Sequence, residues 1–105
     1  MRVVYKAPNH EPFECEVPNS LNALQSMVNG QIEVLELKHG VDMIVNEMGR
    51  LENCPLNQVL WFQDIKQEVP IYGAMLLCSA EGEDFCSLDN KQLVYALDVA
   101  ESGVV

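Results

Sequence analysis

Residues 31–45 read QIEVLELKHGVDMIV, and this stretch decides the fold. Two runs rich in β-branched and aliphatic residues, Gln31–Leu37 and Val41–Val45, lie on either side of Lys38-His39-Gly40. Two such runs joined by a short connection that contains glycine predict an antiparallel hairpin. We therefore expect a largely antiparallel sheet, which the neighbouring segments of the chain would join.

The N-terminal segment predicts a second hairpin. Val3–Tyr5 is a short apolar run, and FECEV, which ends at Val17, alternates apolar and acidic residues. Strict alternation is typical of a strand with one buried face, so Phe13, Cys15 and Val17 are expected to point inward. The connector between the two runs, PNHEP, is rich in turn-forming residues.

Two helices are predicted from capping residues and apolar spacing. Asn19 or Ser20 would cap the first helix, and Asn29-Gly30 would end it with the glycine in the left-handed conformation. Ser87 would cap the second helix. The expected buried faces are Leu21, Leu24, Met27 and Val28 in the first helix, and Leu93, Val94 and Leu97 in the second.

The middle of the chain has the weakest pattern. A short helix is expected after Pro55, with Leu56, Val59, Leu60 and Phe62 as its apolar residues. Residues 71–78 are nearly continuously apolar and predict a buried central strand. The acidic residues 81–84 predict a solvated loop.

The expected order is therefore strand, strand, helix, strand, strand, strand, helix. This order predicts a single small α+β domain over residues 1–105, with a flexible tail at about 101–105. The sheet would contain about five strands and would carry both helices on one face. The sequence leaves monomer and homodimer open, and an exposed edge at Val3–Tyr5 or Val41–Val45 would pair two copies.

Composition excludes several classes of partner. The 105 residues include 16 acids and 6 bases, for a formal net charge of -10. Nucleic acids and anionic membrane surfaces both require clustered Lys and Arg, so neither is expected as a partner. The N-terminal apolar run is too short for a signal peptide, and no apolar run is long enough to span a membrane. We therefore expect a cytoplasmic protein.

No motif in the sequence predicts a catalytic, cofactor or metal site. Four cysteines stand far apart at Cys15, Cys54, Cys78 and Cys86, and neither histidine lies near them in sequence. This spacing favours reduced, incidental thiols over a metal site, and no glycine-rich phosphate loop is present. An enzyme whose site assembles from separated residues, such as Cys78, Cys86 and His39, stays open.

Trp61-Phe62 is the bulkiest apolar pair outside the predicted strands. If the two rings are exposed, they would form an apolar patch of the kind that marks an interface. If they are buried, they would cover the core beside the central strand. The sequence leaves both alternatives open.

Several segments, taken together, resemble the bacterial and phage family of the domain of unknown function DUF3846. The similarity covers nearly the whole chain, and the order and spacing of its segments carry it. These segments are Ser20–Gln25, Val28–Val34, Ile44–Leu51, Pro55–Asn57, Ile71–Gly73 and Phe85–Asp89. This chain departs from the common pattern at Asn53-Cys54, where a glycine is usual, and at Leu60–Phe62, where the family is more polar.

The resemblance implies a small intracellular α+β protein. It also implies an origin in gut bacteria, phages or conjugative elements, often near genes for antirestriction proteins. It implies no catalytic residue, so the expected function is that of a non-enzymatic accessory protein that acts by protein–protein contact. The alternatives are an acidic DNA mimic of the antirestriction type and an enzyme without a recognisable motif.

Six residues are candidates for the contact surface. Within the segments that carry the resemblance, Glu47, Arg50 and Asn57 would meet a partner. The structural alternative places Asn46 in a turn, gives Gly49 a positive φ and lets Pro55 begin a helix. With the aromatic pair, the candidate surface is Asn46, Glu47, Arg50, Asn57, Trp61 and Phe62.

Overall fold

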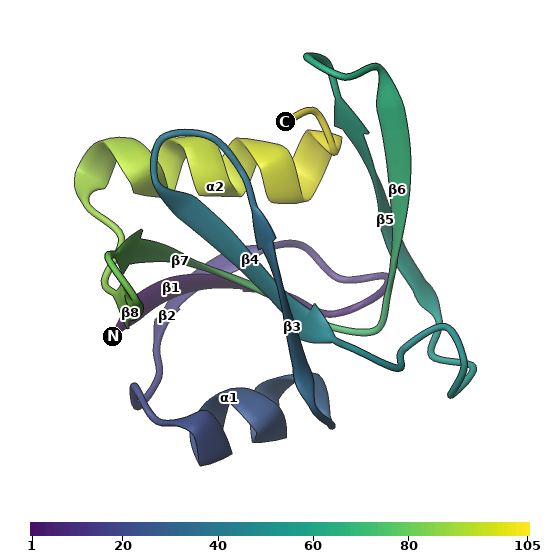
Figure 1. The fold of residues 1–105 in the computed structure, drawn as a ribbon, viewed down its shortest axis with the longest axis horizontal. Coiled ribbons are helices and arrows are strands. Elements are labelled where there is room, and N and C mark those ends of the chain that lie inside the picture. Colours follow the sequence, from purple (N-terminus) through teal and green to yellow (C-terminus); the bar gives the residue numbers. More distant parts are fainter.

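The computed structural model describes all 105 residues and contains eight strands and two helices (Figure 1). In chain order they are β1 (Arg2–Lys6), β2 (Phe13–Glu16), α1 (Leu21–Val28), β3 (Ile32–Glu36), β4 (Val41–Asn46), β5 (Leu56–Phe62), β6 (Gln67–Tyr72), β7 (Met75–Glu81), β8 (Asp84–Cys86) and α2 (Asn90–Ser102). The expected α+β class and antiparallel sheet are confirmed, although the strands number eight rather than about five.

The main sheet is antiparallel, in the order β2-β1-β7-β4-β3, with β8 pairing to β7. The late strand β7 therefore lies between β1 and β4. The expected edges at Val3–Tyr5 and Val41–Val45 are wrong, because both segments lie in strands with a neighbour on each side. The ends of this order are β2 and β3, while β5 and β6 form a separate two-stranded sheet.

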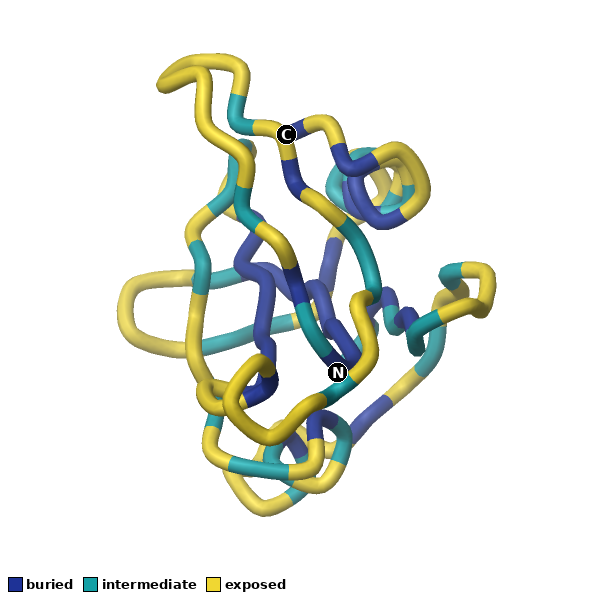
Figure 2. The backbone as a smooth tube through the Cα atoms, turned by 90° about the vertical axis from the view of Figure 1, so that its right-hand side faces the viewer, coloured by how far each residue is buried: buried dark blue, intermediate teal, exposed yellow.

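Each face of the main sheet is covered by a helix (Figure 1). Every residue of β4 is buried, which is typical of a strand that has packing on both faces. The expectation that both helices share one face is wrong for this reason. The α2 side contains Val4, Met43, Leu77, Ala96, Val99 and Ala100, and the α1 side contains Val3, Leu24, Val28, Ile44 and Leu76. Buried residues accordingly lie at the centre of the chain trace, with exposed loops around them (Figure 2).

The helix boundaries differ in part from those expected. Ser20 caps α1 by accepting a hydrogen bond from the Ala23 amide, but Asn29, not Gly30, adopts the left-handed conformation that ends it. The cap of α2 is Asp89, whose side chain and backbone form a reciprocal capping box with Gln92. Ser87 is therefore not the cap.

Three apolar side chains expected in the core are exposed: Phe13, Leu21 and Val94. Phe13 lies on the outer strand β2, where its ring makes an edge-to-face contact with the Tyr5 ring at a centroid distance of 5.8 Å. In α2 the stripe that faces the sheet is centred on Ala96, Val99 and Ala100, which turns Val94 toward solvent.

Two predictions for the middle of the chain are wrong. Residues 56–62 form strand β5 rather than a helix, because their β-branched and aromatic residues pair with β6. The apolar run over residues 71–78 is divided at Gly73, which has a φ of 86°. The chain therefore changes sheet between β6 and β7, and β8 follows after the turn at Gly82.

The predicted flexible tail is instead packed. Glu101 and Ser102 complete α2, Val104 forms a parallel bridge with Trp61, and Val105 is buried in the larger core. The Trp61 amide donates to the Gly103 carbonyl at 2.7 Å, and the Val105 amide donates to the Trp61 carbonyl at 2.9 Å. Residues 103–105 therefore line the edge of β5 opposite to β6.

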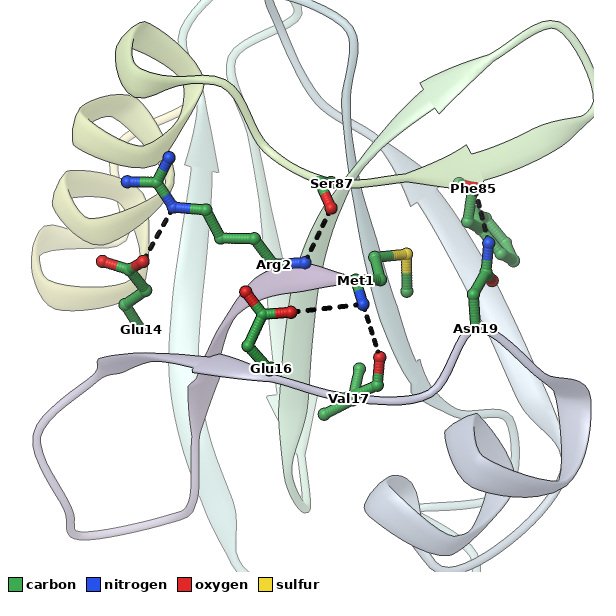
Figure 3. A network of polar contacts seen from close by, with 8 residues as sticks. All are labelled: Met1, Arg2, Glu14, Glu16, Val17, Asn19, Phe85 and Ser87. Carbon is green, nitrogen blue, oxygen red and sulfur yellow. Dashed lines mark hydrogen bonds and ion pairs between the residues drawn. The ribbon is translucent and has the colours of Figure 1, made fainter.

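Polar contacts fasten the first residues to the sheet (Figure 3). The Met1 ammonium donates to the Val17 carbonyl at 2.8 Å and lies 3.5 Å from a Glu16 carboxylate oxygen. The Arg2 amide donates to the Ser87 hydroxyl at 2.9 Å, so Ser87 links β1 to the segment after β8. The Met1 ammonium, the Glu16 carboxylate and the Ser87 hydroxyl therefore hold the N-terminus of the chain against the sheet.

Candidate interaction surface

Trp61 and Phe62, adjacent in the sequence, lie on opposite faces of the β5–β6 hairpin. Leu60 and Phe62 point toward the larger core, where Leu60 is fully buried and Phe62 is partly buried. Trp61 points the other way, and 38% of its surface is exposed. Because side chains alternate along a strand, the core alternative holds for Phe62 and the exposed alternative holds for Trp61.

Four apolar side chains share the outer face of this hairpin. Strand register places Val59 opposite Pro70, and Val104 forms its bridge beside Trp61. Paired residues in a sheet project to the same side, so these four residues form one exposed surface, which we call the Trp61 face. Glu68, the residue opposite Trp61, adds one carboxylate to it.

A groove lies beside the Trp61 face, between the β3–β4 hairpin and β6. We call it the β3–β6 groove, and its volume is about 240 Å³. Pro70 belongs to both surfaces, so they are continuous. The groove is lined by Glu33, Leu35, Val45, Asn46, Glu47, Gly49, Arg50, Val69, Pro70, Ile71 and Tyr72.

Two predicted contact residues lie in this groove with their charged groups free of ion pairs. The loop after β4 places Glu47 and Arg50 there, and both are exposed. The Arg50 guanidinium carbon lies 5.8 Å from the centre of the Tyr72 ring, within the range of a cation–π contact. Neither charged group has an oppositely charged partner within 4.0 Å.

Gly49 is required by close packing and not by backbone conformation. It has no positive φ, so the expectation that it does is wrong. A β-carbon at this position would lie 2.5 Å from the Tyr72 carbonyl oxygen, which only glycine avoids. This close approach holds the loop after β4 against β6 and so defines one end of the groove.

Asn46 is a structural residue at the start of the same loop. Its side chain is buried, accepts a hydrogen bond from the Met48 amide at 2.8 Å and donates to the Asn29 carbonyl at 3.2 Å and the Glu52 carboxylate at 3.1 Å. The expected turn role is consistent with the bond to Met48. Asn46 lines the groove, but its hydrogen bonds are already used.

Asn57 also has its side chain fully engaged within the fold. Its amide oxygen accepts from the Lys6 ammonium at 2.7 Å, while its amide nitrogen donates to the carbonyls of Lys6 and Gly73, each at 2.8 Å. Lys6 is buried and has no carboxylate partner within 4.0 Å. Asn57 therefore fastens β5 to β1, apart from the groove that holds Glu47 and Arg50.

Of the three residues of the enzyme alternative, Cys78 is unsuited to act as a nucleophile. Cys78 is buried, and burial, with smaller contributions from Asp42 and Cys86, raises the pKa of its thiol to about 12. A thiol with such a pKa stays protonated at neutral pH, whereas nucleophilic cysteines are thiolates. His39 lies in the β3–β4 turn, with its ring centre 4.8 Å from that of Tyr95.

Asp42 is the buried carboxylate of the main sheet. It lies opposite Glu36 on β3 and Cys78 on β7, without a basic partner. Burial, and secondly the Glu36 charge, raises its pKa above the ordinary value of 3.8. Because the folded state holds this proton more tightly than the unfolded state, ionisation of Asp42 destabilises the fold.

The raised pKa of Asp42 predicts how the Asp42→Asn substitution changes the free energy of unfolding. The variant is expected to be more stable than the wild type at neutral pH, because its neutral amide avoids the cost of the buried charge. The difference shrinks as the pH falls through the raised pKa and disappears below 3.8, where Asp42 is protonated in both states. Urea unfolding across this range measures it, and a difference that does not vary with pH would contradict the expectation.

The sequence did not predict that four apolar side chains would form the Trp61 face, nor that a groove would lie beside it. Val59 and Trp61 stand two residues apart in a β-branched and aromatic run, and this spacing was the available signal for a strand. Nothing in the sequence indicated that Val104 would join them, because that contact spans 43 positions of the chain.

Comparisons with known proteins identify the chain at the level of a family. A family model described as Domain of unknown function (DUF3846) matches residues 1–100. No curated protein and no solved structure matches the chain. No helix in the structure is both long and apolar enough to cross a membrane, and no group of three or more His, Cys, Asp and Glu side chains is placed to hold a metal ion.

Proposed function

We propose that this chain, which belongs to the DUF3846 family, is a protein-binding module that contacts its partner through the Trp61 face. The observation that carries the proposal is the exposure of four apolar side chains on one face of the β5–β6 hairpin. Exposed apolar side chains that form a contiguous surface, with an aromatic at the centre, are typical of an interface.

The charge of the chain supports a basic partner. A net charge of -10 repels nucleic acids and attracts a positively charged protein surface during encounter. The genetic setting implied by the resemblance supports an accessory role in a phage or conjugative element. In this proposal the chain fills that role by specific binding.

The test is capture of the partner from host lysate with three baits. The wild type and Leu21→Ser are expected to retain the same protein, and Trp61→Ser is expected to lose it. Leu21 is a matched control because its side chain is also exposed and apolar but lies on α1, away from β5. Phe62 stays unchanged, because it packs against the core.

Circular dichroism of each bait verifies folding. Equal retention by Trp61→Ser and Leu21→Ser would contradict the proposal, as would the absence of any specific protein on the wild type. A partner that binds DNA, and that is released steeply as salt increases, would instead favour the acidic DNA-mimic alternative.

A further inference from the structure

Strand β3 exposes an unpaired backbone edge. Its only neighbouring strand is β4. At one end of this pair the Glu47 amide, after β4, donates to the Gln31 carbonyl, before β3, at 2.8 Å, and at the other end the Leu37 amide, after β3, donates to the Val41 carbonyl of β4 at 2.9 Å. In an antiparallel pair, hydrogen-bonding residues alternate. The amides and carbonyls of Ile32, Val34 and Glu36 therefore point away from β4 and have no partner in the protein.

This edge has few of the features that prevent strand addition. The ladder between β3 and β4 extends without a bulge from residue 31 to residue 37, and it contains no proline or lysine. The free edge of β6, in contrast, contains Pro70, which has no amide hydrogen to donate. The charged residues of β3 itself are Glu33 and Glu36, which disfavour an acidic strand but not a basic one. The edge is therefore able to accept a further strand of basic character.

The β3–β6 groove lies next to this edge and has the lining for a cationic side chain. Leu35, Val45, Val69 and Ile71 give it apolar walls. Glu33 and Glu47 supply two carboxylates against the single cation, Arg50, so the lining carries a net negative charge. Neither carboxylate has a basic group within 4.0 Å. A lysine or arginine side chain matches this lining, because its stem is apolar and its head is charged.

The size of the groove favours a side chain over a free ligand. Its volume of about 240 Å³ is below the range of about 300–1,000 Å³ that is usual for small-molecule sites. Glu33 and Leu35 project from β3 on the groove side, so a strand added beside β3 would place alternate side chains next to them.

We propose that β3 accepts an extended basic segment of a partner protein as an added strand, and that a lysine or arginine of this segment lies in the β3–β6 groove. The inference rests on the proposed function in one respect, namely that the occupant is another protein. A second copy of this chain is a poorer match, because each copy carries a net charge of -10.

The direct test uses a synthetic seven-residue peptide that alternates valine and lysine, with a valine–glutamate peptide as the control. The lysine peptide is expected to bind and to shift the amide resonances of Ile32, Val34 and Glu36, and the glutamate peptide is not. Equal binding of both peptides, or shifts confined to residues outside β3 and the groove, would overturn the inference.

Variants separate the two parts of the proposed site. Glu33→Gln with Glu47→Gln is expected to weaken binding of the lysine peptide at least tenfold. Glu81→Gln with Glu83→Gln, which removes the same charge at the distant β7–β8 turn, is expected to change the affinity much less. Similar losses in the two double variants would show only general attraction to an acidic protein and would overturn the groove assignment.

Val34→Pro tests the backbone edge without removing a bond of the β3–β4 ladder, because the Val34 amide points away from β4. It is expected to abolish peptide binding, whereas Val34→Thr, which keeps the amide, retains it. Urea unfolding verifies that both variants are folded. If Val34→Pro does not fold, backbone N-methylation of Val34 in a semisynthetic chain removes the same donor, and unchanged binding in either form would overturn the proposal.

The captured partner distinguishes this inference from the proposed function. Loss of the partner with Trp61→Ser but not with Val34→Pro would overturn strand addition and leave the Trp61 face as the interface. Loss with Val34→Pro alone would overturn the Trp61 face and support β3. A wild-type dimer in sedimentation that Val34→Pro dissociates would identify a second copy as the occupant and overturn the proposal of a basic segment.

Discussion

The Asn57→Ala variant is expected to lose about 3 kcal/mol of unfolding free energy, because it removes the oxygen that solvates a buried ammonium. The Asn57 side chain accepts from Lys6 at 2.7 Å and donates to two main-chain carbonyls at 2.8 Å. After truncation, Lys6 keeps only its longer contact of 3.5 Å to the Asn57 main-chain carbonyl, and the carbonyls of Lys6 and Gly73 both lose this donor. Urea unfolding at neutral pH measures the loss.

Two further variants test the cause of this loss. Asn22→Ala, at an exposed position in α1 with no side-chain hydrogen bond, is expected to change stability by less than about 0.5 kcal/mol. Lys6→Met is expected to recover part of the loss when it is combined with Asn57→Ala, because it removes the buried charge that has lost its side-chain acceptor. A loss that stays the same in this double variant would show that the ammonium is not its source.

The Gly103→Ala variant is expected to lose about 2–4 kcal/mol of unfolding free energy, through two effects that add. Gly103 ends α2 with a φ of 79°, a conformation that is unfavourable for alanine. A β-carbon there would also lie 2.5 Å from the Val59 carbonyl oxygen, so the backbone would have to move. Urea unfolding gives the magnitude.

Gly82→Ala is the matched control for this prediction. Gly82 has a φ of 64°, but no atom lies within 4 Å of a β-carbon at this position, so only the conformational cost remains. We expect that cost to be about 1–2 kcal/mol. Trp61 is the only tryptophan of the chain, and its fluorescence is expected to change in Gly103→Ala and not in Gly82→Ala. Equal losses in the two variants would contradict the role of the contact with Val59.

The local part of the fold was predictable from the sequence, because short-range patterns determine it. Alternation and turn residues identified the hairpins of β1–β2 and β3–β4, and Ser20 was one of the two residues, with Asn19, that were expected to cap α1. The family was predictable from segments spread over nearly the whole chain, and the match over residues 1–100 confirms it.

The division of residues 71–78 was not predictable from hydrophobicity. The apolar side chains on both sides of Gly73 are buried, but they belong to different sheets. The positive φ of Gly73 makes the change of direction possible, and a glycine within an apolar run was the only sign of it. If the chain is not divided at Gly73, β6 is not recognised as the strand that pairs with β5. A helix is then the prediction for residues 56–62.

The candidate surface was only partly predictable, because the sequence does not show which polar groups are already bonded. Asn46 and Asn57 are turn-prone polar residues like many that lie on surfaces, yet both have several internal hydrogen bonds. Glu47 and Arg50 form no ion pair, and the structure brings them to one groove. The groove depends on the contact between β4 and β6, which local patterns do not encode.

The central place of β7 has a consequence for the kinetics of folding. The hairpins β1–β2, β3–β4 and β5–β6 each form from adjacent segments, but β1 and β4 become neighbours of a common strand only when β7 enters between them. The pairing of Val4 with Leu77 closes a loop of more than seventy residues, and such closures slow the rate-limiting step of folding. Until that step, the apolar faces of β1 and β4 stay open to other chains, so refolding yield is expected to fall as protein concentration increases.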